Sequence, residues 1–332
     1  MTTLLITAIA GDVAQAIAQI VRETFPDWRI LGCDIHFRHG AALFVDEWSV
    51  APRADSINYQ LWIESQIKKK KVDICLPMSE AELLYFTKAG IRNVADTLFV
   101  MPNAQAIEVG CDKLTTARFL MSVGCPAPWT IPASECNDET PIPCVIKPRR
   151  GAGSKDVFIC NTMKEARFFS ERYPDSILQE LLLPEDQEVT CAIYRTLDGR
   201  IAVLQLLRKL AGGSTVWAKV IDNPEIQNQC RHLASKLELR GSINVQLRVT
   251  NQGPRIFEIN PRFSSTVRIR HIMGFTDIIW ALKEITGDKI ELVSPPKGLI
   301  GIRTQQASLL NVNDDYLINQ FNSPPFKPNS EI

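Results

Sequence analysis

The pattern of apolar strands in this chain changes near residue 110, and this change limits the folds that the chain can adopt. Before that point, residues 4–8, 30–34 and 72–77 read as buried strands, and residues 13–25 and 59–70 have helical patterns. Strands that alternate with helices predict a parallel, doubly wound α/β sheet. The first turn carries a single glycine, Gly11, so the sequence lacks the glycine fingerprint of a dinucleotide site.

After residue 110 the strands are spaced as in antiparallel sheets. Residues 113–124 read as one short amphipathic helix that Gly124 ends. Strands are expected at residues 144–147, 157–160, 189–195, 201–207, 243–249 and 255–259. Asp198-Gly199 and Asn251-Gln252-Gly253 lie between neighbouring strands and are typical of hairpin turns. This part is therefore predicted to be α+β, and the polar, proline-rich residues 311–332 are predicted to be a loosely ordered tail.

Composition excludes several classes of partner. A chain of 332 residues suits two or three packed lobes. Its 37 lysine and arginine residues balance 37 acidic ones, so no overall field draws it to nucleic acid or to an anionic membrane. The nine cysteines form no CxxC or Cys/His cluster, which favours free thiols in a reducing cytoplasm. We find neither a signal peptide nor a run of roughly 18 apolar residues, and we expect a soluble cytoplasmic protein.

The most informative segment is the pair of strands around residues 246 and 258. Glu258 and Asn260 alternate along one strand and therefore point the same way. The turn at residues 251–253 folds this strand back on the strand of Gln246, which can join the other two side chains. One carboxylate and two amide oxygens suit Mg²⁺ shared with phosphate. A buried polar network at a strand end would give the same pattern.

Two further segments indicate a nucleotide. Lys147 ends an apolar strand, and residues 149–154 form a loop whose glycines leave backbone N–H groups free to bind phosphate, although such a glycine pair is also common in plain hairpins. It is not a Walker loop, which needs Gly-Lys-Ser/Thr at the start of a helix. Residues 177–183 are apolar apart from Gln179 and Glu180, which suits either an adenine-binding segment or an ordinary core strand.

In this order the segments resemble the ATP-grasp family, especially the synthetase units of carbamoyl-phosphate synthetase and biotin carboxylase, over roughly residues 4–302. The resemblance rests on Asp112-Lys113-Leu114, the Gly124-Cys125-Pro126-Ala127-Pro128 exit and the Glu258-Ile259-Asn260-Pro261-Arg262 run. It implies a Rossmann-like lobe (1–110), an ATP-grasp subdomain with the phosphate loop and adenine hinge (111–190) and a subdomain with the metal site (191–310).

The resemblance also implies the roles of individual residues. ATP would be bound by Lys113, Lys147, Gly151, Gly153, Ser154, Glu180, Leu181, Leu182 and Glu188, Mg²⁺ or Mn²⁺ by Gln246, Glu258 and Asn260, and the substrate carboxylate by Arg262 and Arg208. Arg268, Arg270 and His271 follow the metal strand and are candidates to line the acceptor or carboxylate pocket, the alternatives being a solvated helix face or contacts with phosphate. Where many relatives have Gly-Glu, this chain has Gly213-Ser214, which puts the acceptor chemistry in doubt.

The function implied is an ADP-forming ligase that activates a carboxylate as an acyl phosphate and joins it to an amine, an amino acid being one candidate partner. The alternatives are a carboxylate or carbamate kinase, a non-catalytic nucleotide-binding module, and a nicotinamide-dependent oxidoreductase built on the first lobe. The sequence does not identify the substrates, and it leaves a homodimer open.

Overall fold

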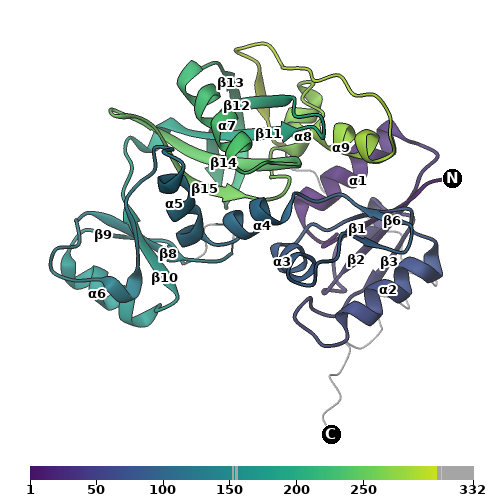
Figure 1. Ribbon diagram of the computed structural model, residues 1–332, viewed down its shortest axis with the longest axis horizontal. Coiled ribbons are helices and arrows are strands. Elements are labelled where there is room, and N and C mark those ends of the chain that lie inside the picture. The colour runs from purple at the N-terminus through teal and green to yellow at the C-terminus, as the bar shows by residue number, and fades with distance from the viewer. Residues whose placement is uncertain (152, 154–155, 305–307, 309–332) are drawn as a thin grey trace, which may run out of the picture. The chain divides into compact units, whose positions relative to one another are not determined.

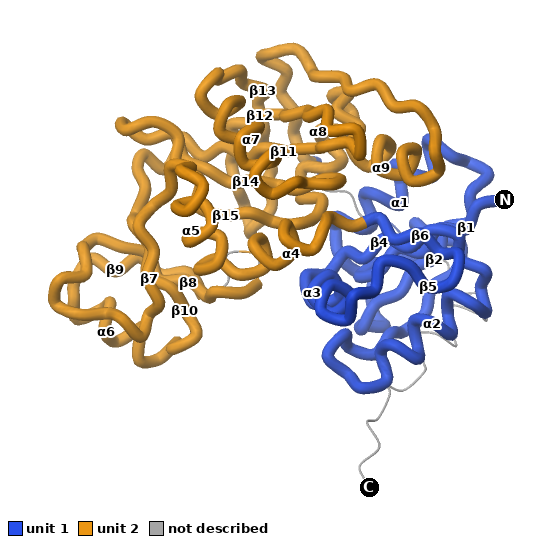
Figure 2. The backbone as a smooth tube through the Cα atoms, viewed as in Figure 1, with its two compact units in different colours: residues 1–100, 304–332 blue, residues 101–303 orange. Residues whose placement is uncertain are grey.

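The computed structural model describes residues 1–151, 153, 156–304 and 308, and the chain forms two compact units. Figure 2 shows the two units in different colours: among the described residues, 1–100 with Thr304 and Ser308 form one, and 101–303 form the other. Ser154 and the predicted tail at residues 311–332 lie outside the described residues. No helix among the described residues is long and apolar enough to cross a membrane.

The first unit is built on a largely parallel sheet in the order β3-β2-β1-β4-β6-β5. Figure 1 labels strands β1, β2, β3 and β6 of this sheet. Its strands are β1 (Thr3–Thr7), β2 (Arg29–Asp34), β3 (Glu47–Val50), β4 (Ile74–Leu76), β5 (Asn93–Val94) and β6 (Thr97–Phe99). The connecting helices are α1 (Asp12–Thr24), η1 (Ala41–Leu43), α2 (Tyr59–Lys70) and α3 (Glu80–Lys88). Strand β1 is buried throughout and pairs in parallel with β2 and β4, so the predicted parallel α/β sheet is confirmed.

The second unit contains two antiparallel sheets, of which the smaller has the order β7-β10-β8-β9. Its strands are β7 (Thr130–Pro132), β8 (Cys144–Pro148), β9 (Phe158–Cys160) and β10 (Ser176–Glu180), and its helices are η2 (Ala133–Glu135) and α6 (Met163–Arg172). Cys144, Ile146 and Leu178 bury one face of this sheet against Ala166 of α6. Because side chains alternate along a strand, Lys147 points to the opposite face of β8.

The larger sheet has the order β15-β14-β11-β12-β13-β16. Its strands are β11 (Glu188–Arg195), β12 (Ile201–Ala211), β13 (Ser214–Ile221), β14 (Gly241–Thr250), β15 (Gly253–Asn260) and β16 (Ile300–Ile302). The remaining helices are α4 (Ala104–Gly110), α5 (Lys113–Ser122), η3 (Glu185–Gln187), α7 (Pro224–Lys236), α8 (Val267–Ile272) and α9 (Asp277–Ile285). One face is apolar: Val189, Val245 and Ile259 pack there with Leu233 of α7 and Val109 of α4. The alternate side chains therefore face the other way.

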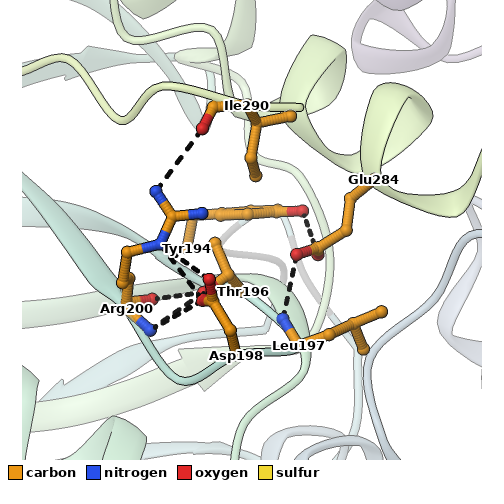
Figure 3. A network of polar contacts seen from close by, with 7 residues as sticks. All are labelled: Tyr194, Thr196, Leu197, Asp198, Arg200, Glu284 and Ile290. Atoms are coloured by element: carbon orange, nitrogen blue, oxygen red, sulfur yellow. Dashed lines mark hydrogen bonds and ion pairs between the residues drawn. The ribbon is translucent and has the colours of Figure 1, made fainter. Parts of the chain in front are cut away.

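Polar contacts hold the turn between β11 and β12 to the region of α9 (Figure 3). The hydroxyl of Tyr194 donates to Glu284 at 2.8 Å. Arg200 pairs with Asp198 at 2.9 Å and donates to the carbonyl oxygen of Ile290 at 3.4 Å. These contacts lie at the end of β11 opposite Glu188 and stabilise the sheet there.

Candidate active site

The face of the larger sheet opposite its apolar core is lined by polar side chains. They come from four neighbouring strands and are Glu188 and Thr190 (β11), Arg208 (β12), Asn244, Gln246 and Arg248 (β14), and Glu258 and Asn260 (β15). Burying so many polar groups side by side is costly unless they bind one another or a ligand. This face is therefore the best candidate for a site in the second unit.

A β-bulge decides which residues of β15 reach this face. From the turn, Arg248 pairs with Arg255, and continued pairing would bring Phe257 opposite Gln246. Instead the register shifts, with Leu247 opposite Ile256 and Gln246 opposite Glu258. Phe257 is the extra residue, and a bulge of this kind redirects the side chains that follow it. Glu258 and Asn260 therefore share a face with Gln246 and Asn244, as the sequence predicted for Gln246, Glu258 and Asn260.

The three predicted metal ligands differ in whether their side chains already make hydrogen bonds within the protein. Neither the carboxylate of Glu258 nor the side-chain amide of Asn260 has a hydrogen bond or ion pair within the part of the chain that the structure describes. The Oε1 atom of Gln246 accepts a hydrogen bond from Arg208 Nη2 at 2.8 Å and keeps one lone pair. A carboxylate with amide oxygens beside it matches the donor set of Mg²⁺, and the metal role of all three residues stays a prediction.

Lys147 is a buried cation, only 7% exposed. Its Nζ lies 5.2 Å from the centre of the Phe257 ring, and no ion pair with it occurs among the described residues. Burial lowers its pKa to about 8, which nearby Glu258 and Glu188 partly oppose and which Lys113 reinforces. Predicted site residues of both sheets and of α5 thus lie within electrostatic reach of one ammonium group. Such a cation, buried and unpaired, is suited to an anionic ligand.

Lys113 begins α5, whose N-cap is Asp112. The Asp112 side chain accepts from the backbone N–H of Leu114 at 2.9 Å and pairs with Arg149 at 2.6 Å. Lys113 Nζ donates to the carbonyl oxygen of Gly151 at 2.7 Å. The lysine therefore lies against the start of the predicted phosphate loop.

The two described glycines of that loop, Gly151 and Gly153, have φ angles of +101° and +86°. Other residues rarely adopt such angles, so the glycines are needed for this backbone path. The third predicted loop residue, Ser154, lies outside the described residues.

The predicted adenine hinge follows β10. The Glu180 carboxylate pairs with Arg255 at 2.9 Å. The carbonyl oxygen of Leu182 accepts from Arg248 Nη1 at 2.7 Å. The backbone N–H groups of Leu181, Leu182 and Leu183 have no hydrogen-bond partner in the described part of the chain. Unpaired backbone donors after a buried strand suit the edge of a purine ring.

Glu188 and Arg208 received separate predicted roles, as ligands of ATP and of the substrate carboxylate, but they are bound to each other. Arg208 Nε and Nη2 donate to Glu188 Oε1 at 3.0 and 2.7 Å. Arg248 Nη2 donates to Glu188 Oε2 at 2.7 Å. The side chains of Arg208 and Glu188 are only 5% and 14% exposed. This network could not be predicted from local sequence patterns, because Glu188 and the two arginines belong to three different strands.

The arginines after β15 are placed differently from one another. Arg262 is half-buried, its backbone N–H donates to the carbonyl oxygen of Asn260 at 2.8 Å, and its role as a carboxylate ligand stays a prediction. Arg270 is wholly buried and makes two hydrogen bonds to Asp277, at 2.9 and 2.7 Å. The interpretation of Arg270 as a pocket residue is therefore wrong, because its guanidinium is already bound within the fold.

Sequence reasoning also missed Asn244. It is 1% exposed, and its Oδ1 accepts from the Thr190 hydroxyl at 2.9 Å. Its Nδ2 has no hydrogen-bond partner among the described residues. Asn244 lies opposite Asn260 in the register of β14 and β15. Asn244 lies two residues before Gln246, and this spacing in a strand could have predicted that the two side chains share a face.

Comparisons with known proteins identify the fold that contains this face. Residues 111–266 match the family model of the ATP-grasp domain, so this part of the chain is an ATP-grasp domain, and the resemblance found in the sequence is confirmed. The structure has, more particularly, the fold shared by N5-carboxyaminoimidazole ribonucleotide synthetases and biotin carboxylases.

Three solved structures illustrate the likeness. An ADP complex of N5-carboxyaminoimidazole ribonucleotide synthetase has a TM-score of 0.72 at 17% identity, over 90% of this chain and 80% of that one. The Staphylococcus aureus enzyme with ADP has a TM-score of 0.71 at 18% identity, over 89% and 80%. The biotin carboxylase domain of Hydrogenobacter thermophilus 2-oxoglutarate carboxylase, with MgADP, ADP and bicarbonate, has a TM-score of 0.67 at 14% identity, over 88% and 71%. Comparison with curated protein sequences finds no match.

Proposed function

We propose that this protein is an ADP-forming ATP-grasp ligase, which uses ATP and Mg²⁺ to activate a carboxylate and joins it to an amine. One observation carries the proposal. The buried ammonium group of Lys147 lies within electrostatic reach of the Glu258 carboxylate, and neither group has an ion-pair partner among the described residues. An unligated protein gains nothing from burying the ammonium group of Lys147 without a partner or from leaving the half-buried carboxylate of Glu258 without one. A metal-bound triphosphate would satisfy both.

We assign different roles in phosphoryl transfer to different residues of this face. Lys147 and Lys113 neutralise phosphate oxygens, and the loop at Gly151 and Gly153 covers them. Glu258 and Asn260, with Gln246, would bind Mg²⁺, which supplies charge neutralisation at the phosphates. Catalysis of this kind rests on positioning and electrostatics, and no protein nucleophile is required.

The reaction has two steps. An oxygen of the substrate carboxylate attacks the γ-phosphorus, the bond to the β–γ bridging oxygen breaks, and ADP leaves. The amine nitrogen then attacks the acyl carbon, phosphate departs with the bonding electrons of the C–O bond, and the nitrogen loses a proton. We assign the orientation of the carboxylate to Arg262 and to Arg208, whose Nη1 makes no hydrogen bond to a described residue.

The proposal is tested by measuring ADP release over a panel of carboxylate–amine pairs. We expect turnover with one pair and a loss of at least roughly 100-fold in Glu258→Gln. Glu171→Gln, on the exposed surface of α6, is the matched control and should keep full activity. Unchanged turnover in Glu258→Gln would contradict the metal role.

The same panel separates the alternatives. ADP release with the carboxylate alone, and no consumption of amine, would indicate a kinase. Nucleotide binding without turnover on any pair would indicate a binding module. The absence of nucleotide binding would reject the proposal altogether.

Two further features fit this function. All nine cysteines lie in the described part of the chain and are free thiols, in keeping with a reducing cytoplasm, where ATP is available. The biotin carboxylase domain named above is a dimer in its structure. We expect a homodimer here too, which light scattering after size-exclusion chromatography would test.

A further inference from the structure

Arg248 connects two parts of the candidate nucleotide site that are separate in sequence. It lies on β14, two residues after Gln246, and its side chain is only 15% exposed. Nη1 donates to the carbonyl oxygen of Leu182 and Nη2 to Glu188 Oε2, each at 2.7 Å. One planar guanidinium thus joins the backbone after β10 to the first residue of β11.

The bond to Leu182 sets the direction of the next backbone donor. The peptide bond between Leu182 and Leu183 is not among the cis bonds of the chain, so its C=O and N–H point in opposite directions. With the carbonyl of Leu182 directed at Arg248, the N–H of Leu183 is directed away from it. That N–H has no partner among the described residues. Adenine offers a matching acceptor at N1, whereas hypoxanthine carries a proton there.

The bond to Glu188 fixes a carboxylate. Arg208 contacts its Oε1 and Arg248 its Oε2, so the carboxylate cannot rotate without losing a charge-assisted bond. A carboxylate has about four acceptor positions, and three are used here. One position is left for a hydroxyl group such as that of a ribose.

We infer that Arg248 is a positioning residue for nucleotide selection, because the one guanidinium aligns the backbone donor that meets the base and the carboxylate that meets the sugar. This inference rests on the proposed function. It assigns Arg248 no contact with the reacting atoms.

Isothermal titration of MgADP, Mg·2′-deoxy-ADP and Mg·IDP tests the inference without turnover. The wild-type protein should prefer ADP to both analogues. In Arg248→Met, we expect ADP to bind about 10-fold or more weakly, because charge-assisted hydrogen bonds are lost. We also expect the two ratios of dissociation constants, 2′-deoxy-ADP to ADP and IDP to ADP, to fall toward one.

Arg200→Met is the matched control. Arg200 also bridges a carboxylate, Asp198, and a backbone carbonyl, that of Ile290 (Figure 3). It follows the end of β11 opposite Glu188, whereas Arg248 pairs with Glu188. The Arg200 variant should keep the affinity for ADP and both preferences. If Arg248→Met does not fold, Arg248→Lys gives the same comparison, because one ammonium group cannot reproduce the planar two-armed bridge.

Equal weakening of all three nucleotides in the Arg248 variants, or unchanged preferences, would overturn the inference and leave the proposed function standing. A wild-type protein that binds none of the three would instead reject the proposed function, and the inference with it.

Discussion

Replacing Lys147 by methionine should stabilise the protein. Burial lowers the pKa of Lys147 from its ordinary 10.5 to about 8, so the folded protein binds the proton less tightly than the unfolded chain does. At 1.36 kcal/mol for each pKa unit, this amounts to about 3 kcal/mol lost from stability at pH 7. Methionine removes the charge and keeps an apolar contact with Phe257. We therefore expect Lys147→Met to be more stable at pH 7 by up to about 3 kcal/mol.

The stability difference between Lys147→Met and the wild type should depend on pH. Between the folded pKa and the unfolded one, the unfolded chain holds more protons, so the stability of the wild type rises with pH relative to the variant. The advantage of Lys147→Met should shrink by about 1 to 2 kcal/mol between pH 7 and pH 9.5. Urea unfolding at several pH values measures this, with Lys219→Met, an exposed lysine of β13, as the control expected to change stability by less than about 0.5 kcal/mol.

Binding of a nucleotide should offset the loss of stability that the buried charge of Lys147 causes. Phosphate oxygens near Lys147 would raise its pKa, so MgADP binding near pH 8 should take up a fraction of a proton. Calorimetry in buffers with different ionisation enthalpies measures this uptake. A Lys147→Met variant that is less stable than the wild type, with no change in the difference across pH, would refute the reasoning about Lys147.

Three structural substitutions give further tests by urea unfolding. Arg270→Met should cost about 3 kcal/mol or more, because it leaves Asp277 buried without its partner, and Arg270→Met with Asp277→Leu should recover much of that loss. Gly110→Ala should cost about 1 to 3 kcal/mol, since its Cβ would lie 2.7 Å from the Pro261 ring. Asp112→Ala should cost about 1 kcal/mol through loss of the α5 N-cap. No loss of stability in any one of them would contradict its packing argument.

Helices and hairpins were predicted correctly where the local sequence pattern was strong. The predicted helix at residues 59–70 coincides with α2, and the hairpin predicted at Asp198-Gly199 joins β11 to β12. These elements depend on short-range periodicity and turn residues, which a sequence displays directly. Strands β3, β5, β6, β13 and β16 were not predicted, and each lies at or next to an edge of its sheet.

The site was partly predictable because its motif is local. Glu258 and Asn260 share a face by alternation along one strand. Placing Gln246 with them required a bulge, since pairing counted from the turn at residues 251–253 would bring Phe257 opposite Gln246. Residue counting alone could have revealed the need for an extra residue, but its position at Phe257 depends on tertiary packing.

The charge network was not predictable from one sequence. Arg208, Glu188 and Arg248 meet because β11 pairs with both β12 and β14, and this strand order is a property of the whole sheet. The burial of Arg270 has a similar origin, because Asp277 lies on a different helix. A basic residue after a metal strand looks the same in sequence whether it faces a ligand or the interior.

The most direct test of the account is a crystal structure with Mn²⁺ and ADP, in which the anomalous signal of manganese locates the metal. We predict a manganese peak bonded to the side-chain oxygens of Glu258 and Asn260, with a phosphate oxygen in contact with Lys147. A nucleotide bound elsewhere, with no manganese at Glu258, would contradict the assignment of this face as the active site.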